Sequence, residues 1–435
     1  MITRHTAASG VQPTRHRSRL LAAFLTLLLL SGLSHALPTD TPTETGPPEC
    51  PPQIQTAIAQ IHAAIDGPID TPNCDQQGAT LAIKNSDQAI TLQLYASQLP
   101  IAEPHRFYGL ASYYNAIRLL NIDGNDVSSF SDQQPTPLNG QHLLAAVGRF
   151  EVELFDAPGA IATIDHDTDR IELSWPPGNA GPLSIILAKK TELSAINPDW
   201  SAIRYSHLWS WLASLSMAAE WALVQIQRHV TDNWGWSIVL FAILLKLLLL
   251  PINLMTVRFQ REVSRYQAQL APQLDEIKAQ YDGEEAHQRI MAAHKALGIT
   301  PFYTLKPVLG SFIQVPVLIA VFNALGEMPQ LAGASFLWVS DLAYPDAIAT
   351  LPTTIPMLGN QFNLLPIVMT LITVLSTLIF DNRHVTKAEL KRQKRNLYLM
   401  AAAFLILFYP FPAAMVLYWT LFNLLQAIQQ QLFRI

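Results

Sequence analysis

The stretch GWSIVLFAILLKLLLLPIN, from Gly235 to Asn253, contains one charged side chain, Lys246, among uncharged and mostly apolar residues. Its length and composition are typical of a membrane-spanning helix. Insertion scales assign a lysine at the centre of such a helix a cost of about 2.5 to 3.5 kcal/mol. Because of this cost, a lysine at this position is expected to have a role in the function of the protein.

The composition of the whole chain is typical of a membrane protein. Half of the 435 residues are hydrophobic, 14% are charged, and the apolar residues gather in long blocks. Residues 37–200 carry twenty Asp and Glu against seven Lys and Arg, whereas residues 201–435 carry thirteen against seventeen. The two parts are therefore expected to face different surroundings.

The amino terminus has the pattern of a secretory signal. Four arginines precede an apolar run from Leu20 to Leu33, which is followed by small residues ending at Ala36. Residues 1–36 are therefore predicted to be a cleavable signal peptide, with an uncleaved anchor as the alternative. In either case the following chain is exported, and the stretch 37–55, rich in Pro and Thr, is predicted to be a disordered leader.

Residues 56–200 are predicted to form a mainly β periplasmic domain with a sandwich-like fold. Stretches such as GRFEVELFDA and DRIELSW alternate apolar with polar residues, and Asn, Asp, Gly and Pro separate them. The two cysteines of the chain, Cys50 and Cys74, both lie in the exported part. A disulfide between them is chemically allowed there, and two unrelated thiols are the alternative.

Further apolar segments follow the first one, at Val308–Leu325, Phe362–Phe380 and Leu397–Phe433. A continuous helix through the last segment would be about 55 Å long, nearly twice a hydrocarbon core of about 30 Å. Pro410 and Pro412 are therefore predicted to divide it into two antiparallel spans. Residues 231–435 thus predict an α-helical polytopic membrane protein with five spans.

The basic residues of the connecting segments predict the orientation of these spans. Residues 256–307 contain seven Lys and Arg and residues 381–396 contain six, whereas residues 327–360 contain none. The positive-inside rule puts the first two segments in the cytoplasm and the third outside, with the mature amino terminus periplasmic and the carboxyl terminus cytoplasmic. The tryptophan-rich stretch 201–230 is then predicted to be an amphipathic helix in the membrane interface.

The cytoplasmic segment 256–307 has a helical period of its own. Apolar residues recur every three or four positions up to the Asp282-Gly283 turn and again after it, which predicts a helical hairpin. Six acids nearly balance its seven bases, so we expect a solvated face and no nucleic-acid sequence recognition.

The sequence also lacks a nucleophile elbow, a Walker loop, an HExxH motif and a cysteine cluster. We therefore expect no enzyme activity, no cofactor and no metal site.

Lys246 has no carboxylate partner in the predicted spans, because none of their interiors contains Asp or Glu. Its stem of about 6 Å is too short to reach either helix end, about 12 to 15 Å away. Polar residues on the other spans could hold water around it, although each of them alone is more often a packing residue. These residues are Gln314, Asn323, Thr370, Thr373, Ser376, Thr377, Tyr418, Asn423 and Gln426.

Four stretches, in order, resemble the YidC/Oxa family of membrane protein insertases: NWGWSIVLFAILLKLLLLPIN, FIQVPVLIAVFNAL, FLWVSDLAYPD and FPAAMVLYWTLFNLLQAIQQQLF. The resemblance covers about Leu208 to Phe433 and implies a five-helix insertase core with a polar groove open to the cytoplasm and the lipid. Lys246 stands where the family usually has a groove arginine, and Tyr418 and Trp419 match aromatic residues that contact nascent chains. The predicted groove residues are Lys246, Gln314, Asn323, Thr373, Thr377, Tyr418, Trp419, Asn423 and Gln426.

The function that this resemblance implies is that of an insertase and chaperone of the bacterial inner membrane. It would move hydrophilic segments through the groove and release hydrophobic helices into the bilayer. Nascent membrane proteins and lipid are the implied partners, and the Sec translocon and the ribosome are further candidates. The sequence ends at Arg434-Ile435 without the basic extension that helps relatives hold ribosomes, so ribosome docking is expected to be weak.

Two other classes of function are compatible with parts of the sequence. One is an anion transporter or channel that uses Lys246 as its substrate site, and the other is a structural scaffold that binds partners through the exported domain. Internal repeats and intramembrane carboxylates, which are frequent in transporters, are not evident in the sequence. Because every groove feature lies in residues 208–433, the exported domain is expected to be dispensable for insertion.

Overall fold

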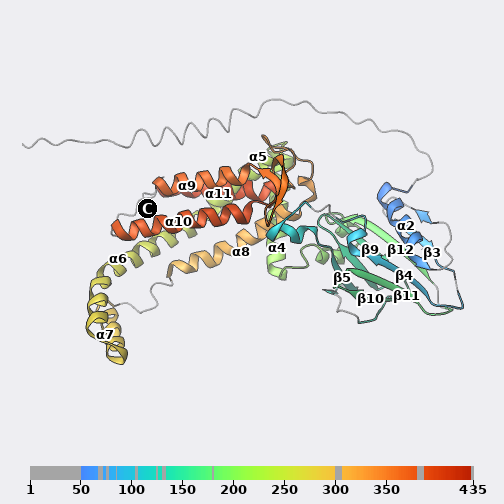
Figure 1. Ribbon diagram of the computed structural model, residues 1–435, viewed down its shortest axis with the longest axis horizontal. Helices are drawn as coiled ribbons and strands as arrows, with labels where there is room; N and C mark the ends of the chain where they lie inside the picture. Colours follow the sequence, from blue (N-terminus) through green and yellow to red (C-terminus); the bar gives the residue numbers. More distant parts are fainter. Residues whose placement is uncertain are drawn as a thin grey trace, which may run out of the picture. The chain divides into compact units, whose positions relative to one another are not determined.

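The computed structural model describes residues 50–66, 72–74, 78–84, 86–102, 106–123, 126–129, 134–178, 181–298, 306–379 and 387–432. The predicted signal peptide and most of the predicted leader lie outside these residues. Figure 1 shows most of the strands in the chain before α4 (Ser210–His229) and the long helices after it. The prediction of a mainly β domain followed by helices is therefore confirmed.

Two antiparallel sheets form the first part, called the β domain here. The five-stranded sheet has the order β1-β4-β11-β10-β7, and the seven-stranded sheet has the order β2-β3-β12-β9-β8-β5-β6. The strand bounds are β1 (Ile65–Asp66), β2 (Asn73–Cys74), β3 (Gly78–Ala82), β4 (Ile90–Tyr95), β5 (Arg118–Asp123), β6 (Asp126–Ser129), β7 (Thr136–Pro137), β8 (His142–Val147), β9 (Glu151–Asp156), β10 (Ile161–Asp165), β11 (Arg170–Trp175) and β12 (Pro182–Lys189).

The alternation that predicted strands is also what fills the core of the β domain. Ile171, Leu173 and Trp175 occupy every second position of β11 and are completely buried, so one face of this strand points into the domain. They share a hydrophobic cluster with residues of the seven-stranded sheet such as Leu81 and Ile185. The two sheets therefore pack as a sandwich around one core.

A helix, α2 (Pro52–Ala64), precedes the strands and begins before the end of the predicted leader. A proline near the first position of a helix costs no backbone hydrogen bond, so the Pro-rich stretch can start one. Ile54, Ile58 and Ile61 recur along one face of α2 and are buried in the sandwich core. The Cys50–Cys74 disulfide links the start of this helix to β2.

Short helical turns lie between the strands and long helices at several points of the chain. They are the 3-10 helices Ala96–Gln98, Gly109–Asn115, Pro198–Ile203 and Pro329–Leu331, and the short helix α3 (Leu193–Ile196). In α4, Leu212, Ser216 and Leu223 are buried, whereas Trp211 and Trp221 are exposed. The helix is therefore amphipathic, as its sequence indicates.

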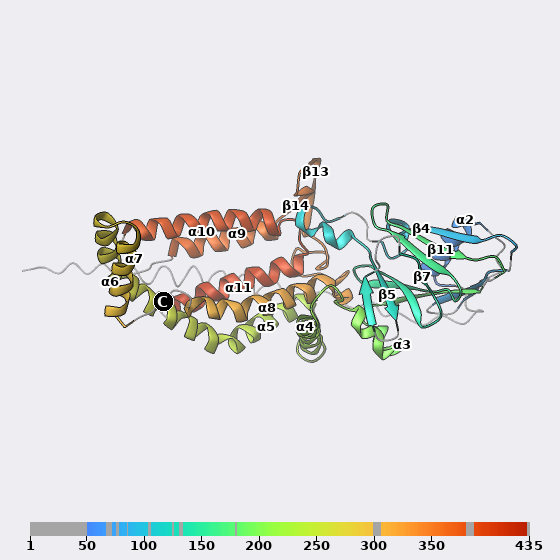
Figure 2. The same cartoon turned by 90° about the horizontal axis from the view of Figure 1, so that it is seen from below.

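The second part, called the helical region here, contains the long helices and one hairpin of strands, and Figure 2 shows α9 and α10 side by side. The bounds are α5 (Trp234–Leu248), α6 (Leu250–Gln280), α7 (Gly283–Ala296), α8 (Lys306–Glu327), β13 (Ala347–Ile355), β14 (Gly359–Asn363), α9 (Leu365–Ile379), α10 (Lys387–Phe408) and α11 (Ala413–Leu432). The break between α10 and α11 contains Pro410 and Pro412, which cannot continue a helix without loss of hydrogen bonds.

The stretch that predicts the first span is divided between two helices. α5 ends at Leu248 and α6 begins at Leu250, with Pro251 in its first turn. Among the described residues, no helix by itself is both long and apolar enough to cross a membrane; Trp234–Leu248 and Leu250–Gln267 satisfy that condition together, with a bend of 55° between them. Shorter apolar helices cover Gln314–Glu327, Leu365–Leu378 and Ala413–Gln429.

α6 and α7 form the helical hairpin expected around the Asp282-Gly283 turn. α6 ends at Gln280 and α7 begins at Gly283, whose φ of 62° is accessible to glycine at little cost. Val263 and Leu270 on α6 are buried in a small cluster that includes residues of the second helix. The periodic apolar residues of the sequence therefore hold the two helices together.

Candidate functional site

Lys246 lies near the end of α5, and its side chain is buried against α11. Only 8% of the residue is exposed, and its Nζ donates a short hydrogen bond to Oε1 of Gln426. The same Nζ lies 4.4 Å from the centre of the Phe422 ring, one helical turn before Gln426. The ammonium group is thus held by an amide dipole and an aromatic face.

The described contacts of Lys246 are with uncharged groups. Among the described residues, no carboxylate forms an ion pair with Lys246. An amide oxygen and an aromatic face offset part of the desolvation of an ammonium group but carry no net charge. The site therefore keeps the capacity to attract a negative charge from another molecule.

A second predicted pair joins α9 to the same helix. Nδ2 of Asn423 lies 3.4 Å from Oγ1 of Thr373, which itself donates to the backbone oxygen of Met369. Thr377, one turn further along α9, is buried and donates to the backbone oxygen of Thr373. Asn423 therefore faces α9, whereas Gln426 faces α5, and α11 carries polar side chains toward both neighbours.

Tyr418 and Trp419 lie in an aromatic cluster between α8, α10 and α11. Trp419 stacks on Phe408 of α10 at 5.3 Å between ring centres, and both Tyr418 and Trp419 contact Phe322 of α8. Nε1 of Trp419 is buried, and no described protein atom accepts its hydrogen. Such a donor needs a partner, which water or a bound peptide can provide.

Two predicted groove residues, Gln314 and Asn323, lie on α8 but at different heights along the helix. Gln314 is half-buried near the middle of the helix. Asn323 does not join Lys246; its Oδ1 faces Nε2 of His207 at 2.8 Å, and its Nδ2 donates to the backbone oxygen of Ile319. The nine predicted residues thus divide into a Lys246 site on α5 and α11, a polar contact to α9, an aromatic cluster, Gln314 near the middle of α8, and Asn323 near the end of α8.

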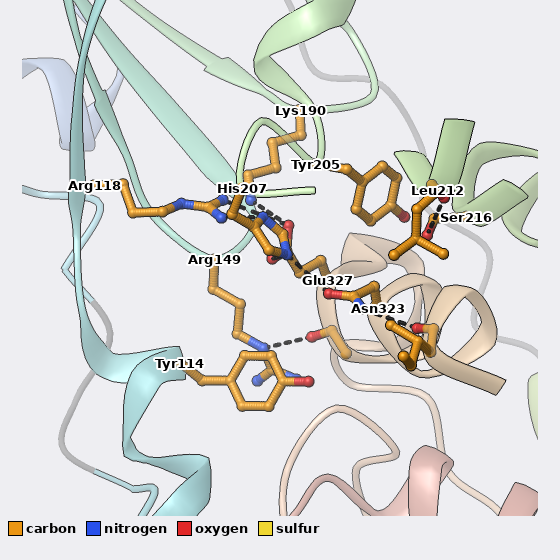
Figure 3. Close-up of polar contacts among 12 residues, drawn as sticks. Tyr114, Arg118, Arg149, Lys190, Tyr205, His207, Leu212, Ser216, Asn323 and Glu327 are labelled. Carbon is orange, nitrogen blue, oxygen red and sulfur yellow. Dashed lines mark hydrogen bonds and ion pairs between the residues drawn. The ribbon is translucent and has the colours of Figure 1, made fainter. Parts of the chain in front are cut away.

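Asn323 belongs to an ionic cluster that sequence reasoning missed (Figure 3). Glu327, the last residue of α8, lies 2.7 Å from Nζ of Lys190, 3.7 Å from Arg118 and 3.7 Å from His207. Lys190 follows β12 and Arg118 begins β5, so two strands of the β domain meet the end of one long helix. No pattern in the sequence signals this cluster, because its members come from separate segments of the chain.

The cluster contains more positive than negative charge, and this excess affects its pKa values. Burial by itself would raise the pKa of Glu327, but Lys190, Arg118 and His207 outweigh it and lower the pKa. The pKa of Lys190 is lowered to about 8, chiefly by burial; Glu327 opposes this shift, and Arg118 adds to it. At neutral pH the glutamate is therefore ionised and is shared among cations.

Arg149 makes a second contact between the same two parts. It lies in the turn between β8 and β9 and is 3% exposed. Its Nε donates to the backbone oxygen of Gly326 and its Nη2 to that of Ala343, each at 2.7 Å. A cation that donates to the last carbonyls of a helix satisfies groups that the helix leaves unpaired and opposes its dipole.

Residues 225–435 match the family described as 60Kd inner membrane protein. Curated relatives named membrane protein insertase YidC include that of Chlamydia trachomatis serovar D, 32% identical over 263 residues, and that of Leptospira interrogans serovar Lai, 34% identical over 215 residues. These alignments cover 58% and 48% of this chain and 32% of each relative, so the chain spans about a third of the length of the curated relatives it matches.

A solved structure titled "Active YidC insertase crystal structure with the first transmembrane domain resolved" is similar to this chain at 16% identity and a TM-score of 0.36. The match covers 87% of this chain and 97% of that chain.

The fold and the site define a protein of two parts, a β-rich domain followed by a helical region that carries a buried lysine with no acidic partner among the described residues. Residues 225–435, just under half of the chain, are similar to the 60Kd inner membrane protein family, which is the YidC/Oxa family. The recognition of this family from the sequence is therefore confirmed.

Proposed function

We propose that this protein is a membrane protein insertase and chaperone. It accepts a hydrophilic segment of a nascent membrane protein beside Lys246 and releases the adjoining hydrophobic helix into the lipid. The observation that carries this proposal is the setting of Lys246, which contacts an amide and an aromatic ring but, among the described residues, no carboxylate. The name membrane protein insertase YidC, given to the curated relatives, supports the same activity.

The chemistry of the site suits transient binding of acidic segments. A carboxylate that enters the groove gains an ion pair with Lys246, which replaces the weaker contact with Gln426. The other predicted groove groups are neutral, so no second cation strengthens the pair, and it can break again. Burial of apolar surface in lipid at about 25 cal/mol per Å² then drives release of the hydrophobic helix, so the process requires no nucleotide and no cofactor.

We also propose five membrane spans, with the β domain in the periplasm and the carboxyl terminus in the cytoplasm. The spans are the bent pair of α5 with the first part of α6, followed by α8, α9, α10 and α11. The seven bases of residues 256–307 and the six of residues 381–396 support the orientation, because both segments connect spans on the same side. The exposed tryptophans of α4 fit a helix in the interface, where aromatic rings with one polar edge are favoured.

The experiment that tests the function is reconstitution of the purified full chain into lipid vesicles. A small membrane protein with one span, released from synthesis in the presence of these vesicles, should become protected from external protease. Vesicles without the protein are the control for spontaneous insertion. A flux of chloride or phosphate through the same vesicles, without any insertion, would instead favour the anion transporter that the lysine also suits.

A further inference from the structure

One segment lies between two strands of the β domain in the chain, but its side chains pack against the helical region. This segment, called the wedge here, is Phe107–Asn115 and includes the 3-10 helix Gly109–Asn115. Phe107, Ala111 and Tyr114 are 2%, 0% and 3% exposed, and they share a hydrophobic cluster with residues of α8 and α11. The sandwich core of the β domain is a separate cluster that contains none of these three residues.

Tyr114 lies between the end of α8 and the beginning of α11. Its Oη lies 3.2 Å from Sδ of Met415, and its ring meets that of Phe411 edge to face at 6.5 Å. On the other side it lies directly over Gly326, where an added Cβ would come within 1.9 Å of the Tyr114 oxygen. Glycine at position 326 is therefore what allows the tyrosine to lie between the two helices.

Phe107 extends the contact to the loop that precedes β13. Its ring stacks on Tyr344 at 5.8 Å and 18°, and the backbone oxygen of Tyr344 accepts from the N–H of Ala413 at the start of α11. Asn115 holds the two ends of the wedge together, because its Nδ2 donates to the backbone oxygen of Phe107 at 2.9 Å. The wedge thus reaches the first turn of α11 by two routes.

Arg149 fixes the wedge against α8 and the same loop. Besides its hydrogen bonds to Gly326 and Ala343, its guanidinium lies 4.7 Å from the ring centres of both Phe107 and Tyr114. Two charge-assisted hydrogen bonds and two aromatic faces in a buried position make this a strong contact. A lysine could keep the charge but could not reach both carbonyls in this planar arrangement.

We infer that the wedge and Arg149 are positioning elements of the groove: they set the spacing between α8 and α11, the two helices that carry Gln314 and the Tyr418–Gln426 face. The contacts lie at Gly326 and Met415, near one end of each helix, so a change there alters how the helices diverge toward Lys246. The inference rests on the proposed insertase function for its consequence. It also reverses the expectation that the β domain is dispensable.

The test uses the full chain in vesicles and measures two quantities for each variant. Hydrogen–deuterium exchange of peptides that cover Phe107–Asn115 and the first turn of α11 reports whether the wedge is packed against α8 and α11. Protease-protected insertion reports the consequence. Arg149→Ala should raise exchange in both peptides by about tenfold or more, as expected when a buried charged hydrogen bond is lost, and should reduce insertion. Arg149→Lys should lie between this variant and the parent.

Controls separate the wedge from general damage to the β domain. Arg170→Ala, on a strand of the five-stranded sheet, and Leu110→Ala, a wedge residue that is 61% exposed, should leave both quantities near the parent. Gly326→Ala should unseat the wedge in the parent but add little in a Tyr114→Ala background, because the clash with the tyrosine oxygen is then absent. This comparison remains informative even if Arg149→Ala folds poorly.

The outcomes distinguish the inference from the proposed function. Unchanged exchange in Arg149→Ala and Gly326→Ala would overturn the seating of the wedge. If exchange rises but insertion stays at the level of the parent, the wedge contributes only to the packing of the two parts, and the positioning role is overturned. A parent that inserts nothing would overturn the proposed function, and the positioning role with it. Lys246→Ala should differ from the wedge variants in exchange alone: it should also lower insertion but leave wedge exchange unchanged.

Discussion

Lys190 and Glu327 form an ion pair of 2.7 Å in which the two side chains are 4% and 7% exposed. Lys190 follows the last strand of the β domain, and Glu327 is the last residue of α8. An ion pair buried to this extent costs desolvation, so its presence gives specificity to the contact more than net stability. The removal of only one partner leaves the other charge buried and unpaired.

We therefore expect Glu327→Ala to destabilise the junction by about 3 to 5 kcal/mol, because Lys190 and Arg118 then lose their shared carboxylate. The double variant Lys190→Met with Glu327→Leu should recover much of this loss. Urea unfolding of the full chain in detergent measures both values. Arg289→Ala, which breaks an exposed pair with Glu285, is the matched control and should cost no more than about 0.5 kcal/mol.

The same junction should weaken in acid because of His207. Its Nδ1 faces a guanidinium nitrogen of Arg118, which can only donate, so the neutral ring carries its proton on Nε2 and donates to Asn323. Burial lowers the pKa of His207 below its ordinary value of 6.5, Glu327 and Asn323 oppose this effect, and Arg118 and Lys190 add to it.

A histidine whose pKa is lower in the folded state gives stability that is complete above its unfolded pKa and is lost as the pH falls through the folded pKa. The free energy of unfolding should therefore decrease from pH 7 to pH 5. Glu327, whose pKa is also lowered, adds a further loss below about pH 4.5. His207→Gln should flatten the dependence between pH 7 and 5; a variant with the parental slope would rule out this histidine as its source.

Glu153 predicts the opposite dependence in the β domain. It is 1% exposed on β9, and burial raises its pKa from 4.5 to about 8. Because the folded state binds the proton more tightly, stability should fall as the pH rises from 4.5 to 8. Glu153→Gln should remove this decrease and stabilise the domain most at pH 8, measured as the melting temperature. Glu172→Gln, on the partly exposed face of β11, should leave the decrease in place.

The link between Cys50 and Cys74 can be tested on protein isolated from the membrane without reductant. Mass spectrometry of a digest should find the two cysteine peptides joined. For residues 24 positions apart, the loss of this link should lower the free energy of unfolding of the β domain by about 3 kcal/mol. Free thiols on both residues would argue against the periplasmic placement of the β domain or against the pairing.

Hydrophobic periodicity was sufficient to predict much of this fold from the sequence. Alternation predicted strands such as β11, and the spacing of three and four predicted the α6–α7 hairpin. These features depend on residues that are close together in the chain or on its composition, and both can be read from a single sequence. The break between α5 and α6 at Leu249 also has a cause in the neighbouring sequence, because Pro251 lacks the N–H that would continue the hydrogen bonds of α5.

The junction between the two parts could not be predicted in this way. Arg149 and Gly326 lie 177 positions apart, and Lys190 and Glu327 lie 137 apart, so no periodicity connects them. Asn323 shows the same limit: its place on an apolar helix suggested the groove, whereas its partner, His207, comes from the chain before α4. Contacts of this kind depend on how the two parts pack, which the pattern of either part does not contain.

The central claim, that Lys246 receives acidic segments of the substrate, is tested most directly by protease-protected insertion of one substrate in an acidic and a neutralised version. Lys246→Arg should insert both versions as the parent does, because the positive charge remains. Lys246→Ala should lose about tenfold with the acidic version and much less with the neutral one, and Lys246→Glu should insert the acidic version least, because like charges repel in a partly desolvated groove. Equal insertion of the acidic version by the parent and Lys246→Ala would contradict the account.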